Sequence, residues 1–129
     1  MRSLRSVAFI GNHLPRRCGI ATFTHDLHRA VAATAKNLDT CVVAMSDANS
    51  VYAYPEPVRL QVRDKIDQDY RNAATFLNDG GFGVVSLQHE YGIFGGEAGA
   101  KILELLPRLE MPIVTTLHTV LEAPSSAQR

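Results

Sequence analysis

The sequence predicts an α/β fold in which a parallel sheet is covered by helices on both faces. Short apolar runs are typical of strands buried on both faces, and helical patterns separate most of these runs. A length of 129 residues fits one domain, 1–129. The expected element order is β-α-β-β-α-β-α-β. Because crossovers between parallel strands are right-handed, we expect a three-layer, Rossmann-like parallel sheet with strand order 3-2-1-4-5.

The first half of the chain predicts two buried strands with a helix between them. The strands are expected near residues 6–11 (SVAFIG) and 40–46 (TCVVAMS), the first of them in the centre of the sheet because it is apolar on both faces. After a polar loop, apolar residues recur at helical spacing and predict the buried stripe of a helix, formed by Ile20, Phe23, Leu27 and Val31.

The middle of the chain predicts a weaker strand and a second helix. The strand is expected near residues 58–62, and Asp64 is a candidate cap for the helix that follows. Gly80 suits a left-handed position after the last helical turn. The expected apolar stripe of this helix consists of Ile66, Tyr70, Ala74 and Leu77.

Two more strands and a third helix complete the predicted sheet. The strands are expected near residues 83–88 and 112–117. The helix between them would begin at Glu97, with Pro107 tightening its last turn. Its inward side chains are expected to be Ala98, Ile102, Leu105 or Leu106, and Leu109.

Composition excludes several classes of protein. Thirteen basic residues balance thirteen acidic ones, so nucleic acid is disfavoured as the main partner. No apolar run approaches the ~20 residues of a membrane span, which favours a soluble protein. Cys18 and Cys41 have no metal-binding spacing and form no disulfide framework, so a reducing cytoplasm is the simpler location.

The loop after the first strand is a candidate anion site. Ligands of open parallel sheets bind outside the carboxyl ends of the strands. Gly19 is predicted at a helix N-terminus directly after Arg16, Arg17 and Cys18, where backbone N–H groups and the helix dipole favour an anion. The residues alone leave an alternative open, in which Gly19 makes a turn and both arginines are solvated.

The loop after the fourth strand (QHEYGIFGGEAG) combines polar and aromatic residues. Gln88, His89 and Glu90 precede Tyr91 and Phe94, a combination common in sugar sites. A glycine-rich hinge is the alternative. Adjacent residues point apart on a strand, so His89 and Glu90 do not predict a metal site.

Four further histidines differ in what they indicate. His118 follows a wholly apolar strand and is either a functional residue or a hydrogen-bonded cap. His25 falls on the outer face of the first helix and is expected to be exposed, whereas His13 and His28 are less informative.

Three runs of sequence together resemble a known family. PRRCGIATFTHDL, SLQHEYGIFGGEAG and PIVTTLHTV occur in this order and are similar to the N-terminal domain of bacterial retaining GT-B glycosyltransferases of family 4. The resemblance covers essentially the whole chain. It implies the N-terminal half of a two-domain enzyme, which shapes the acceptor site while a C-terminal domain holds the nucleotide sugar through an E-x7-E motif.

The resemblance implies roles for the candidate residues. Gly19, with Arg16 and Arg17 beside it, would approach the donor diphosphate and the acceptor. Gln88, His89 and Glu90 would line the acceptor side. No cofactor is implied, because the nucleotide sugar is itself the substrate, and no metal is expected if helix dipoles and basic side chains take the phosphate charge. Many relatives have a Gly-Gly pair where this chain has Cys18-Gly19, and the E-x7-E motif is absent here.

The resemblance also implies that His118 is the catalytic histidine. We expect its ring to point toward the loop that holds Gly19 and to donate a hydrogen bond to the transferred sugar.

Two functions follow as expectations. The first is transfer of a sugar, with retention, from a nucleotide sugar to a sugar or lipid-linked acceptor, in the cytoplasm or at the inner face of the membrane. The 129-residue chain alone would then be inactive, because it lacks the donor domain. The second is a non-catalytic α/β ligand-binding or interaction module, such as a truncated product. A reading frame that continues beyond Arg129 into a donor domain would favour the first. An unpaired sheet edge would favour dimerisation of the isolated domain.

Overall fold

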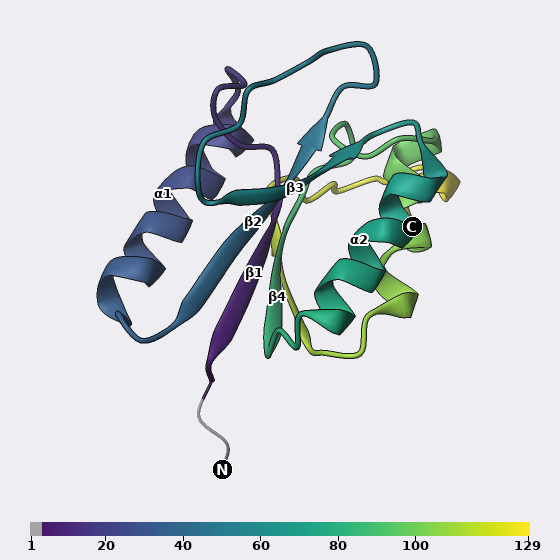
Figure 1. Cartoon of the computed structure of the whole chain (residues 1–129). Coiled ribbons are helices and arrows are strands. Elements are labelled where there is room, and N and C mark those ends of the chain that lie inside the picture. The colour runs from purple at the N-terminus through teal and green to yellow at the C-terminus, as the bar shows by residue number, and fades with distance from the viewer. Residues whose placement is uncertain (1–3) are drawn as a thin grey trace.

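The computed structural model describes residues 4–129 and has five parallel strands in the order β3-β2-β1-β4-β5 (Figure 1). The predicted fold class and strand order are therefore confirmed. Every predicted strand boundary lies within one residue of the observed one. The strands are β1 (Ser6–Gly11), β2 (Asp39–Ser46), β3 (Val58–Arg63), β4 (Val84–His89) and β5 (Ile113–Leu117).

The sheet is built around β1, as its apolar sequence predicts. Ser6 to Gly11 pair in parallel with Asp39 to Ala44 of β2, and Val7 to Ile10 pair with Val84 to Leu87 of β4. Side chains of a strand alternate between the two faces, so β1 contributes to the core on both sides. Phe9 and Ile10 are almost completely buried.

Helices cover the sheet on both faces (Figure 1). Helix α1 (Gly19–Thr34) packs on one face over Phe9 and Val42. Helix α2 (Asp67–Asp79) and the 3-10 helices η1 (Glu97–Glu104) and η2 (Leu106–Arg108) form the larger part of the core on the other face. A third 3-10 helix, η3 (Ser126–Gln128), follows β5.

Three residues of the predicted stripe of α1 are partly buried against the core, namely Ile20, Leu27 and Val31. The most buried side of the helix nevertheless differs from the prediction. The helix buries Ala21, Thr24 and His28, whereas Phe23 is 42% exposed. Small side chains let the helix approach β1 closely. A Cβ atom placed on Gly11 would lie 2.8 Å from Oγ1 of Thr24.

The predicted stripe of α2 is confirmed, but both of its ends differ from the prediction. Tyr70, Ala74 and Leu77 are buried. Ile66 is the N-cap and provides no side-chain hydrogen bond, while Asp64 instead accepts a hydrogen bond of 2.9 Å from the backbone N–H of Ala48.

At the C-terminus of α2 the left-handed residue is Gly81, with φ of 66°, whereas Gly80 is right-handed with φ of −72°. The predicted turn is thus displaced by one residue.

The third predicted helix is not an α-helix. Its residues form η1 and η2, and the start of η1 is kinked at Ala98 (φ 51°) and Gly99 (φ 78°). Two left-handed residues interrupt the i to i−4 hydrogen bonds that an α-helix requires. Ile102 and Leu105 are buried as predicted, and Pro107 lies in η2.

Candidate functional site

The loops after β1 and β2 lie at the same end of the sheet, where these parallel strands end (Figure 1). Arg16 connects them. Its guanidinium donates hydrogen bonds to Oδ1 of Asn12 (2.8 Å), to the carbonyl oxygen of Met45 (2.7 Å) and to Oδ1 of Asp47 (2.7 Å). The Tyr52 ring lies 5.5 Å from its Cζ, and the Arg16 side chain is only 16% exposed.

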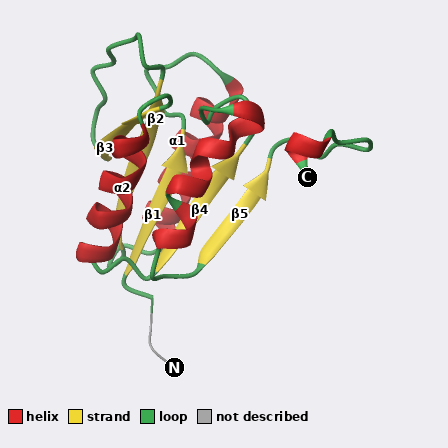
Figure 2. Ribbon diagram, turned by 90° about the vertical axis from the view of Figure 1, so that its right-hand side faces the viewer, coloured by secondary structure: helices red, strands yellow, loops and turns green. Residues whose placement is uncertain are grey.

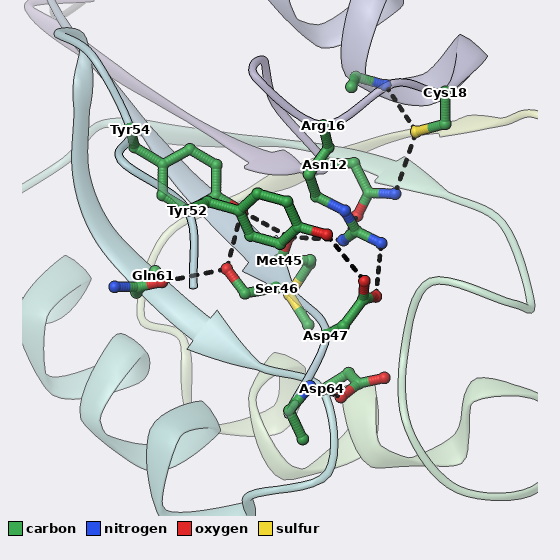
Figure 3. A network of polar contacts seen from close by, with 12 residues as sticks. Asn12, Arg16, Cys18, Met45, Ser46, Asp47, Tyr52, Tyr54, Gln61 and Asp64 are labelled. Atoms are coloured by element: carbon green, nitrogen blue, oxygen red, sulfur yellow. Dashed lines mark hydrogen bonds and ion pairs between the residues drawn. The ribbon is translucent and has the colours of Figure 1, made fainter. Parts of the chain in front are cut away.

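Tyrosines extend this network into the loop after β2 (Figure 3). The Tyr52 hydroxyl donates to Oδ2 of Asp47 at 2.8 Å. The Tyr54 hydroxyl shares a hydrogen bond of 2.7 Å with Oγ of Ser46 and donates to the Met45 carbonyl at 3.1 Å. Burial raises the pKa of Tyr54, so this hydroxyl keeps its proton at neutral pH. The network therefore fixes both loops and occupies Arg16 with protein partners.

Gly19 and Arg17 are the exposed part of the predicted anion site. The N-cap of α1 is Cys18, whose Sγ accepts hydrogen bonds of 3.4 Å from the Ala21 backbone N–H and from Nδ2 of Asn12. Apart from its chain neighbours and the backbone of α1, no described atom lies within 4 Å of the position that a Cβ on Gly19 would take, so the helix N-terminus is open. Within residues 4–129 the Arg17 side chain makes no ion pair or hydrogen bond, unlike that of Arg16.

The other predicted residues gather where β4 and β5 end. His118 approaches Gln88, with 3.0 Å between its Nε2 and Oε1 of Gln88. Its backbone N–H donates to the carbonyl of His89 at 2.9 Å. The rings of His118 and Phe23 of α1 form a T-shaped pair with 4.6 Å between ring centroids. His118 thus lies against the helix that begins at Gly19.

Gln88 is completely buried, and its Nε2 donates a hydrogen bond of 3.1 Å to Oγ of Ser86. This burial separates it from a ligand, so Gln88 can act at an acceptor site only through His118. Glu90 is also committed within the chain, because its Oε2 accepts a hydrogen bond of 2.7 Å from the backbone N–H of Gly92.

His89 is held between aromatic rings. Its ring stacks on Phe94 with 5.8 Å between centroids and forms a T-shaped pair with Tyr91 at 5.1 Å. Its Nδ1 is buried without a hydrogen-bond partner among residues 4–129. Burial lowers the pKa of His89; the opposing effect of Glu90 is smaller, and His118 lowers it further. A neutral His89 at neutral pH follows.

The histidines near α1 are more buried than the sequence indicated. His25 is half-buried, and its ring meets that of His13 at 5.3 Å. His13 is fully buried and bonds the Leu14 carbonyl through Nδ1 at 2.9 Å, while His28 shares a hydrogen bond of 2.8 Å with Oγ1 of Thr40. Nε2 of His13 and Nδ1 of His28 have no partner within the described chain.

A hollow of about 370 Å³ lies elsewhere, beside β3 and α2. None of the predicted site residues lines it. Its charged residues pair with each other, since Nε of Arg63 donates to Oδ2 of Asp69 at 2.7 Å. The lining residues are Ser50, Val51, Leu60, Gln61, Arg63, Asp69 and Asn72.

Residues 4–129 bring together no set of three His, Cys, Asp or Glu side chains that could hold a metal ion. Among the helices of the same residues, none combines the length and apolarity needed to cross a membrane. Comparison of the chain with protein-family models, curated proteins and solved structures finds no match.

Proposed function

We propose that the chain is the acceptor-side N-terminal domain of a retaining GT-B glycosyltransferase of family 4. The observation that carries the proposal is the contact between His118 at the end of β5 and Phe23 of α1, with ring centroids 4.6 Å apart. This contact joins two of the three sequence runs of the resemblance, and the third reaches the same place because Oε1 of Gln88 lies 3.0 Å from Nε2 of His118. Aromatic faces combined with polar groups suit a saccharide.

The proposed chemistry divides between two parts of this edge. His118 orients a sugar hydroxyl, and the open N-terminus of α1 at Gly19 stabilises charge on the leaving diphosphate. Arg17 is the exposed cation beside it. Arg16 keeps the loop in place, because its guanidinium already bonds Asp47. The nucleotide sugar would bind mainly to a C-terminal domain, and the acceptor is a sugar or a lipid-linked sugar.

A non-catalytic saccharide-binding module is the second candidate. The commitment of Arg16 to Asn12, Met45 and Asp47 favours it, because that arginine is not free to bind a phosphate. Under this function the cluster at His118 binds a saccharide without any transfer.

The deciding experiment measures sugar transfer from a panel of nucleotide sugars by a protein that joins this chain to a donor domain. Replacing His118→Ala should lower turnover by ~10²–10³-fold, the usual cost of losing one positioned group in a transition state. Because His118→Ala also leaves Oε1 of Gln88 without its partner, the melting temperature should fall, so turnover is compared per folded molecule. A stable and fully active variant would remove His118 from the site.

An experiment on the 129-residue chain by itself distinguishes the two candidate functions. Glucose, galactose, mannose and N-acetylglucosamine are titrated into the ¹⁵N-labelled chain, with His118→Ala as the control. Shifts centred on Phe23, His89 and His118, without transfer by any joined protein, would favour the binding module. Transfer by the purified chain alone would contradict the two-domain proposal.

A further inference from the structure

The carboxamide of Gln88 lies between two polar side chains inside the protein. Its Nε2 donates to Oγ of Ser86 at 3.1 Å, and its Oε1 lies 3.0 Å from Nε2 of His118. Gln88 has no exposed surface, so water does not compete for either contact. The three side chains form a line from the middle of β4 to the end of β5.

With the Gln88 carboxamide in this orientation, the line assigns the proton of a neutral His118 ring to one nitrogen. A carbonyl oxygen only accepts hydrogen bonds, so Nε2 of a neutral His118 facing Oε1 of Gln88 must be the N–H donor. Nδ1 is then unprotonated. Within residues 4–129 Nδ1 of His118 has no hydrogen-bond partner, and it is not among the buried unpaired atoms. A lone pair is therefore presented at the carboxyl edge of the sheet.

Two further contacts restrict the ring. The backbone N–H of His118 donates to the His89 carbonyl, which fixes the residue at the end of the β4–β5 ladder. Phe23 packs against the ring in a T-shaped pair, with 85° between the ring planes. A fixed backbone and a packed ring leave the hydrogen bond to Gln88 as the contact that selects the tautomer.

We propose that Gln88 is a positioning residue that holds His118 in the Nε2–H tautomer, so that Nδ1 accepts a hydrogen bond from a ligand hydroxyl. The hydroxyl belongs to a saccharide, a statement that rests on the proposed function. This proposal reverses the role expected from the resemblance. His118 accepts a hydrogen bond from the sugar hydroxyl instead of donating one to the sugar.

The tautomer can be measured without any ligand. Long-range ¹H–¹⁵N correlation spectra of the ¹⁵N-labelled chain, recorded at a pH where His118 is neutral, distinguish a protonated ring nitrogen from an unprotonated one. We expect His118 to show a protonated Nε2 and an unprotonated Nδ1. Turning the Gln88 carboxamide over would place its N–H against Nε2 and require the opposite pattern. That pattern in the wild-type chain would overturn the proposal.

Variants show whether Gln88 is the cause. Gln88→Met keeps the length of the side chain and removes the acceptor, so Nδ1–H should appear as a substantial fraction. Gln88→Glu restores an acceptor and should return the ring to the Nε2–H form. Gln61→Met is the matched control, because Gln61 of β3 accepts a hydrogen bond from Ser46 of β2, away from His118, and the wild-type tautomer should persist. An unchanged tautomer in a folded Gln88→Met chain would overturn the proposal, and if that variant does not fold, the wild-type spectrum still decides.

Saccharide titration then tests the ligand. Glucose, galactose, mannose and N-acetylglucosamine are the probes, and the expected result is a change at Nδ1 of His118, with Nε2 still protonated. Binding that leaves Nδ1 unchanged would overturn the acceptor role. Absence of sugar binding would contradict the proposed function, whereas the tautomer assignment rests on the spectra of the free chain.

Discussion

Arg16 and Arg17 are sequence neighbours with opposite surroundings. Arg16 is largely buried among Asn12, Met45 and Asp47, whereas Arg17 is exposed. Removing the Arg16 guanidinium leaves the Asn12 and Met45 oxygens and the Asp47 carboxylate without this donor. Arg16→Met should therefore lower the free energy of unfolding by about 1–3 kcal/mol, while Arg17→Met should change it by less than about 0.5 kcal/mol.

Urea denaturation of both variants measures this difference. Equal losses in the two variants would mean that the Arg16 network contributes little to stability. The pair also tests the proposed phosphate role, because pyrophosphate binding should weaken in Arg17→Met even though the fold is unaffected.

Buried histidines give the stability of the chain a predictable pH dependence. Burial is the main cause that lowers the pKa of His13 and of His28 below the ordinary value of 6.5. The unfolded chain then binds more protons than the folded chain as the pH falls below that value. Stability is therefore fully present above pH 6.5 and is lost as the pH falls through 6.5 toward the lowered values.

Chemical denaturation between about pH 8 and pH 5 measures the slope of stability against pH. The double variant His13→Asn, His28→Gln should show a smaller slope than the wild type, because the substituted side chains do not titrate. Its stability at pH 8 is the internal reference, since lost packing affects all pH values alike. An unchanged slope would contradict the assignment of the pH dependence to these two histidines. His89, whose pKa burial also lowers, would then be the remaining candidate.

At the scale of elements, the apolar runs predicted the sheet because its central strands are buried on both faces. In β2, for instance, six consecutive residues from Cys41 to Ser46 are buried, as expected for a strand covered on both faces. The predicted details that were wrong depend on contacts between residues distant in sequence or on local backbone conformation. Asp64 does not cap α2 because Ala48 uses its carboxylate, and η1 is not an α-helix because Ala98 and Gly99 take left-handed conformations.

The candidate site likewise has features that the sequence could predict and features that it could not. The positions of Gln88 and His118 at strand ends were predictable from the position of each residue after an apolar run. The burial of Gln88 and the occupation of Arg16 were not, because each depends on partners from other loops or strands, such as Asp47 and His118.

The glycine-rich loop between β4 and η1 has a packing role that a single substitution can test. The backbone N–H of Gly95 donates to the Tyr70 hydroxyl at 3.1 Å, and that hydroxyl donates to the Asp64 carbonyl at 2.8 Å. A Cβ on Gly95 would collide with the same carbonyl oxygen. Gly95→Ala should therefore destabilise the chain by about 1–3 kcal/mol, as overpacking does.

Gly19→Ala is the matched control, because a Cβ there meets no atom within 4 Å. Its effect on the free energy of unfolding should be within about 0.5 kcal/mol. Thermal or urea unfolding of the two variants provides the comparison. If Gly95→Ala were as stable as Gly19→Ala, the loop would not be packed against Asp64 in solution.

At the scale of the whole molecule, the two edges of the sheet differ in chemistry. The edge strand β3 carries Arg59 and Arg63, which pair with Asp39 and Asp69 at 2.8 and 2.7 Å. The other edge, β5, has the sequence IVTTL without a charge, and Figure 2 shows it as the last strand on its side. Charged side chains protect a sheet edge against pairing with another chain, so β5 is the unprotected edge.

This difference predicts self-association of the chain through β5. Val114 is 60% exposed and Leu117 is 58% exposed, so an antiparallel contact between two β5 strands would bury apolar surface as well as pair backbone groups. Val114→Lys should weaken self-association by roughly tenfold or more, because like charges facing each other across an interface cost at least the ~1.4 kcal/mol that a tenfold change requires.

Leu103→Lys is the matched control, since Leu103 is 64% exposed but lies on η1. Sedimentation velocity over a range of concentrations measures both variants against the wild type. A chain that stays monomeric at every concentration, or a Leu103→Lys variant that dissociates as readily as Val114→Lys, would show that the β5 edge does not pair.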